Sequence, residues 1–353
     1  MDPKEGYSFL PVNLIRTVGI VLVILLHSST EAYINIDLMS NQGVQIWWAS
    51  NIFDSIARVC IPLFVMLAGA LSLQPSKADE PLKLFFKKRW TRLGLPFIFW
   101  CVVYFVWGTF IHGTPLTPQS VTQGVLTGPH YHFWFIYLLV GLYLLTPILR
   151  VTLKYANRKI LKYTLVVWFI GTAVAPAINI FGSFSLNANF FIFTGWLGYF
   201  ILGAYLVKSE IKKGLLYVGL IGGLLLTMGG TYLIVGTLGE KFSQYFYDGF
   251  SVNMIIASIC LFLLLLRAPN VSLLEHSNFN KVLSLIGNNT LAIYLFHVIV
   301  LESLQNGYFG LTLSITSMNP FIAIPLSAAL TLLICLVVIV PLKRIPYVKR
   351  VIG

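Results

Sequence analysis

Ten apolar stretches, each long enough to cross roughly 30 Å of hydrocarbon, recur along the 353 residues of the chain. With 57% hydrophobic and only 10% charged residues, no segment remains that could form a soluble domain of useful size. The sequence therefore predicts an all-α polytopic membrane protein, a bundle of about ten transmembrane helices that forms one domain over residues 1–353. The expected spans are 10–30, 44–73, 93–112, 133–149, 163–181, 190–207, 214–236, 250–266, 284–303 and 320–341.

The basic residues are distributed unequally between the two sides of the predicted membrane. A net charge of +12 could by itself suggest a nucleic-acid partner. With the N-terminus in the cytoplasm, however, the inside segments hold 21 of the 24 Lys and Arg residues, and Lys241 is the one basic residue outside. Arg16 and Arg58 lie within spans. The positive-inside rule therefore predicts a multi-pass protein of the cell membrane with both termini in the cytoplasm and no nucleic-acid partner.

Two further features of the sequence argue against a cleaved signal peptide and against a site built from cysteines. The first span is expected to be an uncleaved helix, because its leader has mixed charge and no small-residue cleavage site is present. The four cysteines each stand alone in an apolar run, so no metal site, redox motif or disulfide is predicted from them. We expect all four to be small core residues: Cys60, Cys101, Cys260 and Cys335.

The first span carries two polar residues on one line. In NLIRTVGIVLVILLHSS, residues 13–29, the step from Arg16 to His27 advances about 16 Å and turns about three times around an α-helix. The two side chains therefore share one face. Facing lipid would be costly, so the line predicts either a protein-lined cavity or interhelical hydrogen bonds that lock the bundle. The spacing alone leaves both open.

These residues resemble the first-helix motif of the integral-membrane acyltransferase-3 family, in which Arg or Lys is followed by ten residues and His. The similarity continues in order along essentially the whole chain, and ten helices is also the usual number in the family. Ala68 departs from the pattern, since relatives often have Ser there, which weakens any role for that hydroxyl. The other similar stretches are RVCIPLFVMLAGALSL (58–73), RWTR (89–92), HFWFIYLLVGLYLLTPILR (132–150) and IGNNTLAIYLFHVIVL (286–301).

The resemblance implies that an acyl group, commonly acetyl, is transferred from a cytoplasmic acyl-CoA to a hydroxyl of an extracytoplasmic glycan or lipid-linked sugar of the cell envelope. Acetyl-CoA or another acyl-CoA would then be a donor substrate, and no bound cofactor is expected. Membrane lipids, the donor and the sugar acceptor are the implied partners. The sequence leaves a homo-oligomer open and does not identify the acceptor.

His27 and Arg16 are the catalytic candidates. Free histidine titrates closest to neutrality, which suits a general base that takes the proton of an attacking hydroxyl. His27 could equally be acylated itself as a nucleophile, and the sequence does not separate the two routes. Arg16 would stand between the donor phosphates and His27, or it would form a structural salt bridge.

Arg89 and Arg92 are the candidates for donor binding. Three residues apart at the start of the third span, they are expected on one face at the cytoplasmic surface, and Arg groups bind phosphate oxygens in a bidentate way. The resemblance associates this Arg-x-x-Arg pair with the CoA side of the reaction. Without it, the stretch KKRWTR would more simply be charge that flanks a span.

Several other polar residues are candidates for an acceptor site or a cavity. Asp54 and Arg58 are four residues apart on one face, either as a neutralising pair or as part of the cavity. Outside, HYHFW offers His130, His132 and Trp134. Interfacial aromatic residues are expected there in any case, but a ring platform beside a histidine also suits a sugar.

Three more residues complete the candidates. His297, in the ninth span, matches a family position and would serve either a core hydrogen bond or the cavity. Glu302 follows it as a charge at the outer end of that span. Glu31, four residues after His27 and on its face, either orients the imidazole or is a solvated loop acid. No metal-binding set is expected.

Two other functional classes remain. Aligned intramembrane Arg and His residues also mark the paths of ions and substrates, so a transporter or flippase-like carrier of a small molecule is the alternative function. If the protein served only as a structural partner in the membrane, the two polar residues in its first apolar helix would have no function to explain them. Release of CoA that depends on His27 would support the enzyme, and flux without thioester cleavage would support the carrier.

The charge asymmetry predicts an orientation that can be measured directly. Lys154→Cys and Lys212→Cys should react with a membrane-impermeant thiol reagent only from the cytoplasmic side, whereas Thr117→Cys and Lys241→Cys should react only from outside. Labelling would be compared between intact and permeabilised cells. Reaction at position 154 in intact cells would overturn the orientation.

Overall fold

The computed structural model describes residues 11–30, 41–182, 195–237, 244–268, 278–308 and 310–353, and all regular structure in these ranges is helical. Within them, eight helical stretches are long and apolar enough to cross a membrane. Two shorter apolar helices lie at the remaining predicted spans. The prediction of an all-α polytopic membrane protein is therefore confirmed. Glu31 and Lys241 lie outside the described residues.

The helices follow one another along the chain with short connections. In order they are α2 (Val12–Ser29), α3 (Asn41–Ala57), α4 (Cys60–Ser72), η2 (Pro75–Lys77), α5 (Leu82–Arg89), η3 (Trp90–Gly94), α6 (Leu95–His112), α7 (Pro118–Thr127), η4 (Tyr131–Phe133), α8 (Trp134–Tyr155), α9 (Arg158–Phe169), η5 (Ile170–Val174), α10 (Ala175–Phe181), α11 (Trp196–Leu206), α12 (Lys213–Thr237), α13 (Val252–Leu266), α14 (Asn278–Gln305), α15 (Pro320–Leu342) and α16 (Pro346–Ile352).

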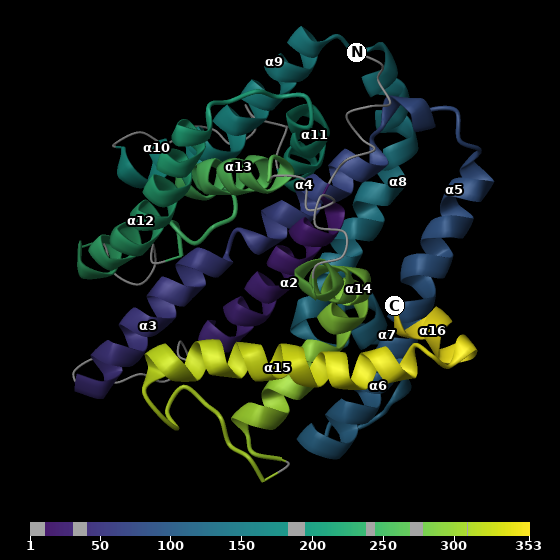
Figure 1. Ribbon diagram of the computed structural model, residues 1–353, viewed down its shortest axis with the longest axis vertical. Helices are drawn as coiled ribbons and strands as arrows, with labels where there is room; N and C mark the ends of the chain where they lie inside the picture. The colour runs from purple at the N-terminus through teal and green to yellow at the C-terminus, as the bar shows by residue number, and fades with distance from the viewer. Residues whose placement is uncertain (1–10, 31–40, 183–194, 238–243, 269–277, 309) are drawn as a thin grey trace.

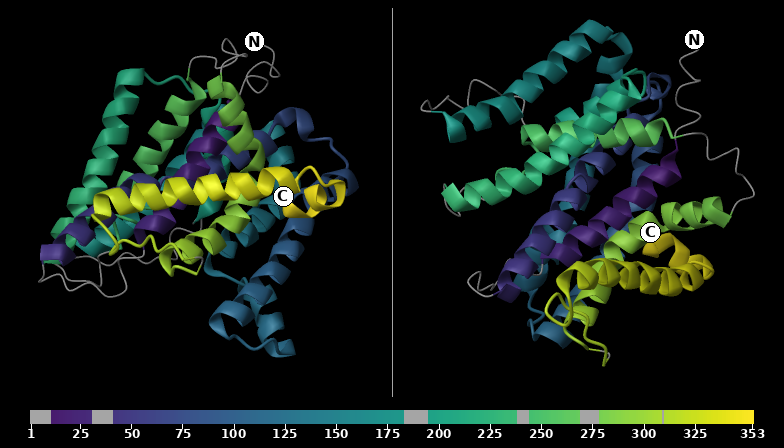
Figure 2. Two further views of the ribbon diagram at one scale, coloured as in Figure 1. Left: turned by 60° about the horizontal axis from the view of Figure 1, so that its bottom comes forward. Right: turned by 60° about the vertical axis from the view of Figure 1, so that its left-hand side comes forward.

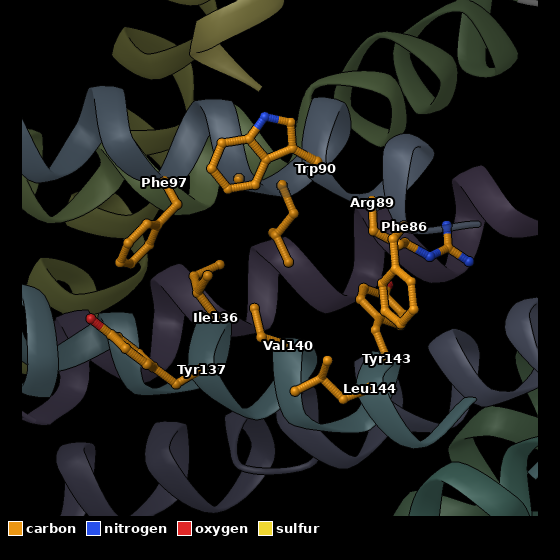
Figure 3. A pocket seen from close by; sticks show the side chains of 11 residues that line it. Phe86, Arg89, Trp90, Phe97, Ile136, Tyr137, Val140, Tyr143 and Leu144 are labelled. Carbon is orange, nitrogen blue, oxygen red and sulfur yellow. The ribbon is translucent and has the colours of Figure 1, made fainter. Parts of the chain in front are cut away.

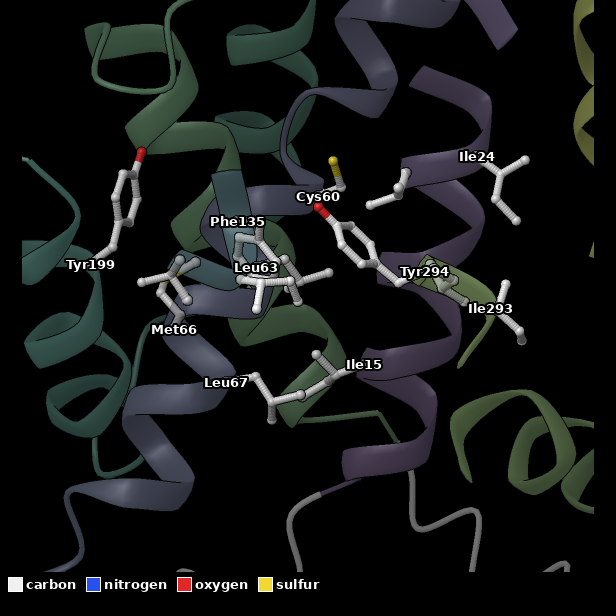
Figure 4. Packing of buried hydrophobic residues seen from close by; sticks show 14 of the residues in the cluster. Ile15, Ile24, Cys60, Leu63, Met66, Leu67, Phe135, Tyr199, Ile293 and Tyr294 are labelled. Atoms are coloured by element: carbon white, nitrogen blue, oxygen red, sulfur yellow. The ribbon is translucent and has the colours of Figure 1, made fainter. Parts of the chain in front are cut away.

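Helix α2 is the central element of the bundle (Figure 1). It packs against α3, α4, α14 and α15, and in the right-hand view of Figure 2 it lies with α3 between the α12–α13 pair and the α14–α15 pair. Ile15 and Ile24 on α2 are completely buried or nearly so, and Figure 4 shows them beside Leu67 of α4 and Tyr294 of α14. Burial on several sides explains why this helix is apolar around most of its circumference.

Helices α4 and α11 approach each other most closely at two glycines. A Cβ atom on Gly69 would lie 1.8 Å from the carbonyl oxygen of Phe200, and one on Gly203 would lie 1.9 Å from that of Met66. Each glycine therefore admits the backbone of the opposite helix. Such small residues are how helices in membranes gain close van der Waals contact, because lipid gives no hydrophobic drive for their association.

The second membrane-spanning stretch is broken where a proline follows. Pro62 has no N–H to bond the carbonyl of Arg58, and α3 ends at Ala57 before α4 begins at Cys60. The two helices remain close to continuous, since the N–H of Arg58 still bonds the carbonyl of Asp54 at 3.0 Å. The break therefore places Arg58 at an irregular turn inside the membrane-spanning stretch Gly43–Ser72.

The third membrane-spanning stretch contains a widened turn, η3, which is π-helical. Pro96 cannot donate to the carbonyl of Arg92, and the N–H of Leu95 instead bonds the carbonyl of Trp90, five residues back. A second π-helical turn, η5, precedes Pro176 in the same way. The helical stretch that contains η3 begins at residue 82, earlier than the predicted 93, so that Arg92 lies within a continuous helix.

The α4–α11 contact predicts a large difference between two glycine substitutions. Gly203→Ala should lower the melting temperature by several degrees, because overpacking of a close contact costs about 1–3 kcal/mol. Gly222→Ala on α12, where a Cβ would meet nothing within 4 Å, should leave it unchanged or raise it slightly. Thermal unfolding of both variants in the same detergent gives the comparison. Equal melting temperatures would show that the two helices can separate without loss.

Candidate functional site

Four histidines from three separate parts of the chain meet at one end of α2. We call His27 of α2, His130 and His132 at η4, and His297 of α14 the histidine cluster. The ring centroids of His27 and His297 are 5.2 Å apart, those of His132 and His297 are 5.5 Å apart, and those of His130 and His132 are 5.4 Å apart. The structure thus brings the four histidines that the sequence offered as candidates into one group.

The cluster contains buried nitrogen atoms that have no hydrogen-bond partner among the described residues. His297 donates through Nδ1 to the carbonyl of Tyr294 at 2.7 Å, since a carbonyl can only accept, and its Nε2 atom is unpaired. Both ring nitrogens of His132, which is fully buried, and Nδ1 of His130 are unpaired as well. Buried polar groups are nearly always hydrogen-bonded, so four such atoms in one cluster mark it as a place for a polar ligand.

His27 is only partly buried, unlike His132 and His297. Its imidazole contacts the ring of Tyr131 edge-on at 5.1 Å and lies tilted against His297. No hydrogen bond joins its side chain to another described residue. Its nitrogens can therefore accept a proton or a group from a ligand, which is what a base or a nucleophile requires.

Glu302 of α14 anchors the outer part of the cluster. Its carboxylate lies 3.0 Å from Nε2 of His130, accepts a hydrogen bond from Nε1 of Trp107 at 2.9 Å, and lies 3.6 Å from Nε2 of His112. From the sequence, Glu302 was expected only as a charge at the outer end of a span. The structure gives this carboxylate a specific contact that orients His130, and it links α14 to α6 and to η4.

Two tyrosines that sequence reasoning missed form part of the same wall. Tyr104 of α6 lies with its ring centroid 5.1 Å from both His130 and His132, and its hydroxyl donates to the carbonyl of Leu295 at 2.9 Å. Tyr131 contacts His27, as described above. Tyr131 stands inside the quoted HYHFW stretch, whereas Tyr104 lies in an apolar run where nothing in the sequence distinguishes it.

Asp54 and Arg58 form an ion pair at the break between α3 and α4. Arg58 Nε lies 2.8 Å from Asp54 Oδ2, and the Asp54 side chain is completely buried. The guanidinium also lies 4.6 Å above the ring centroid of Tyr247, a cation–π contact. Arg58 is also close enough to His27 for their charges to interact.

Trp134 lies outside the cluster. Its ring is 5.8 Å from that of Trp196 on α11 and 6.1 Å from that of Phe135, and it is 43% exposed. The predicted His–Phe–Trp platform is therefore split: His132 points into the protein core and Trp134 packs toward α11.

The other end of α2 lies among arginines. Arg16, which is partly buried, is within electrostatic range of the guanidinium of Arg92 and the hydroxyl of Tyr143. Arg92 is exposed and lines a pocket of about 420 Å³ together with Thr91, Leu95, Pro96, Lys349, Arg350 and Gly353. The polar line of α2 thus runs from Arg16, which is close enough to Arg92 of this pocket for their charges to interact, to the histidine cluster at the other end.

Arg89 lines a different pocket from Arg92. Its guanidinium lies above the rings of Phe85, at 5.0 Å, and Tyr143, at 4.6 Å, and donates to the hydroxyl of Ser72 at 3.4 Å. The two arginines were expected to share one face, but they line separate pockets: the π-helical turn η3 begins directly after Arg89 and contains Arg92, and it changes the angle per residue.

The Arg89 pocket is a mostly apolar groove between α5–α6 and α8, with a volume of about 380 Å³. Figure 3 shows Arg89, Phe86 and Tyr143 at one end of the groove and Phe97 and Tyr137 at the other. Among the described residues that line it, Arg89 alone is charged. Apolar walls with one cation at an end suit a chain with an anionic head.

Arg150 at the end of α8 fixes the connection before α5. Its side chain is nearly fully buried and donates to the carbonyls of Ser72, at 2.7 Å, and Lys77, at 3.2 Å, and to the carboxylate of Glu80, at 2.8 Å. The hydrogen bond from Lys88, followed by that from Arg150, holds the pKa of Glu80 below its usual value, against the opposing effect of partial burial. From the sequence alone, Arg150 was expected only to contribute positive charge on the cytoplasmic side.

No group of three His, Cys, Asp or Glu side chains in the described ranges is arranged to hold a metal ion. All four cysteines are buried and free, as predicted.

Comparison with known proteins gives a match at the level of a family. The model of the acyltransferase-3 family, described as an acyltransferase domain, matches residues 11–340, which is nearly the whole chain. Neither the comparison with curated proteins nor that with solved structures gives a match.

The anchoring contact of Glu302 predicts a split between two substitutions. Glu302→Ala should lower the melting temperature by several degrees, because Trp107 and His130 lose their acceptor and an unsatisfied buried donor costs about 1–3 kcal/mol. Glu302→Gln keeps an acceptor oxygen for one of these two donors and should lose less. Thermal unfolding in one detergent measures both. If the two variants unfold together, the carboxylate does not hold the cluster in place.

Proposed function

Because the chain belongs to the acyltransferase-3 family, we propose that this membrane acyltransferase moves an acyl group, commonly acetyl, from a cytoplasmic acyl-CoA to a hydroxyl of an extracytoplasmic glycan or lipid-linked sugar. The observation that carries the proposal is the histidine cluster, where four buried nitrogen atoms have no hydrogen-bond partner among the described residues and His27 is only partly buried. A hydroxyl and a thioester carbonyl are groups that such atoms can bind.

The two ends of α2 support separate sites for donor and acceptor. Arg16 stands near the pocket of Arg92, at the end that the charge distribution assigns to the cytoplasm, and His27 stands about 16 Å further along the helix. A donor that enters from the basic end and an acceptor that enters from the other end would meet at the histidine cluster. In this proposal the polar line of α2 marks the route of the acyl group.

His27 is the proposed centre of the chemistry. As a base, it takes the proton of the acceptor hydroxyl while the hydroxyl oxygen attacks the thioester carbon; the C–O bond forms, the C–S bond breaks, and the proton passes to the CoA sulfur. As a nucleophile, it would first carry the acyl group on a ring nitrogen and release CoA before the acceptor attacks. An acyl group found on His27 after the donor is added alone would select the second route.

The polar neighbours would position these groups. Glu302 fixes His130, and the Tyr294 carbonyl fixes the tautomer of His297, whose Nε2 atom then has a lone pair. We propose that the unpaired nitrogens of His130, His132 and His297 orient the acceptor hydroxyl next to His27. A general base acts only within hydrogen-bond reach of the proton that it removes, so such positioning is required.

His27→Ala should abolish transfer while the protein remains folded. A general base supplies a factor of about 10² to 10⁴ in rate, so a loss of that size or larger is expected. His27→Gln should be no better, because an amide does not accept the proton. The readout is release of CoA thiol by the purified variant, and loss of the acyl mass increment from surface glycans of cells that carry it.

The matched control is Ser28→Ala, the next residue on α2, whose hydroxyl bonds only the Ile24 carbonyl of its own helix, at 2.9 Å. It should retain activity. Folded His27→Ala protein with near wild-type transfer would refute the assignment. Movement of a small molecule without thioester cleavage would instead support the carrier.

A further inference from the structure

The C-terminal helix α16 completes the basic pocket at the Arg16 end of α2. Arg92 lies in the widened turn η3, whereas Lys349 and Arg350 lie more than 250 residues later in the chain, and all three line the same cavity of about 420 Å³. The other described residues that line it are Thr91, Leu95, Pro96 and Gly353, so the described side chains of the lining include three cations and no Asp or Glu. Such a surface is complementary to a polyanion.

The pocket is built on a fixed segment. Helix α16 packs against α6 (Figure 1), where Nε1 of the buried Trp100 donates to the carbonyl of Ile352 at 3.0 Å. Ile352 is 2% exposed, and a Cβ on Gly353 would lie 3.2 Å from Leu291 of α14. Lys349 and Arg350 are thus held in place by the burial of the residues that follow them.

The positive charge of this region is crowded. Lys343, just past the end of α15, has its pKa lowered first by burial and then by the charge of Lys349. Its ammonium reaches the carbonyl of Asn288 at 3.4 Å. Arg16 adds a further cation within range of Arg92. An anion bound among these groups would relieve their mutual repulsion and would form charge-assisted hydrogen bonds.

We propose that Arg92, Lys349 and Arg350 together form a pocket for the phosphate groups of the acyl-CoA donor, so that α16 is part of the donor site. This inference rests on the proposed function and adds to it two binding residues that lie beyond residue 340, where the family match ends. Phosphate is the chemistry that the pocket recognises, and an anionic lipid headgroup is the other source of it.

The test uses the purified full-length protein and the double variant Lys349→Gln/Arg350→Gln. The dissociation constant of CoA should rise by about tenfold or more, because the variant removes two charge-assisted contacts to phosphate. The rise should shrink at high salt, where the wild-type affinity also falls. Adenosine 3′,5′-bisphosphate, which carries only the nucleotide phosphates, should show the same loss. Isothermal titration gives these values, and the melting temperature confirms folding.

Lys208→Gln/Lys212→Gln is the matched control, since it removes the same charge from exposed positions outside the pocket. Its affinity for CoA should equal that of the wild type. A second arm compares thermal stability in nanodiscs of phosphatidylglycerol and of phosphatidylcholine. If the Lys349→Gln/Arg350→Gln variant loses stabilisation by phosphatidylglycerol but binds CoA normally, the pocket holds a lipid headgroup and the donor assignment is overturned.

The outcomes also separate this inference from the proposed function. Loss of transfer in His27→Ala, together with unchanged CoA affinity in the Lys349→Gln/Arg350→Gln variant, would overturn the role of α16 and leave the function standing. Wild-type protein that binds no CoA would overturn the donor itself, and the inference with it. Weakened CoA binding in that variant alone, with the Lys208→Gln/Lys212→Gln control unchanged, supports the pocket.

Discussion

The enclosure of α2 by other helices is the constraint on which the rest of the structure depends. A charged or hydrogen-bonding side chain that faces lipid costs several kilocalories per mole, so Arg16 and His27 require protein around them. Helices α3, α4, α14 and α15 supply it, and the same helices carry many of the neighbours: Arg58 at the break between α3 and α4, and His297 on α14. The position of the polar line thus determines which helices must be adjacent, and the apolar side chains of α2, such as Ile15 and Ile24, fill the remaining contacts.

Prolines place the candidate arginines at irregular turns. A proline frees the carbonyl four residues before it, and Arg58 and Arg92 stand at that distance before Pro62 and Pro96. The first proline breaks a helix and the second widens it into a π-helical turn. Arg58 thus stands at a helix break, where it keeps its ion pair with Asp54 four residues before it, and Arg92 stands within a π-helical turn. A widened turn also presents backbone carbonyls that are not used within the helix, and such turns occur frequently at functional sites.

The helices were predictable because each one is a long apolar stretch of sequence. Such a stretch can be recognised without knowing which other helices pack against it. Even the two short helices, α11 and α13, lie where expected. The line of Arg16 and His27 was predictable for the same reason, since helical periodicity places both on one face. The convergence of His130 and His297 on His27 was not, because residues more than 100 positions apart meet only through tertiary packing. The roles of Glu302 and Arg150 follow from the same long-range contacts. The widened turn that contains Arg92 follows from Pro96, and it is therefore a local property of the sequence.

The separation between the two ends of α2 also explains how a highly charged donor could react deep within an apolar protein. Moving phosphate groups into the membrane-spanning region would carry a large desolvation cost. In the proposed arrangement they remain in the basic pocket, among Arg92 and its neighbours, where counter-charges and water are both at hand. Only the neutral acyl thioester and the arm that carries it pass Arg16 and travel the roughly 16 Å to His27. The helix that separates the charges from the chemistry therefore lets one substrate be held by electrostatics at its head and react at its uncharged end.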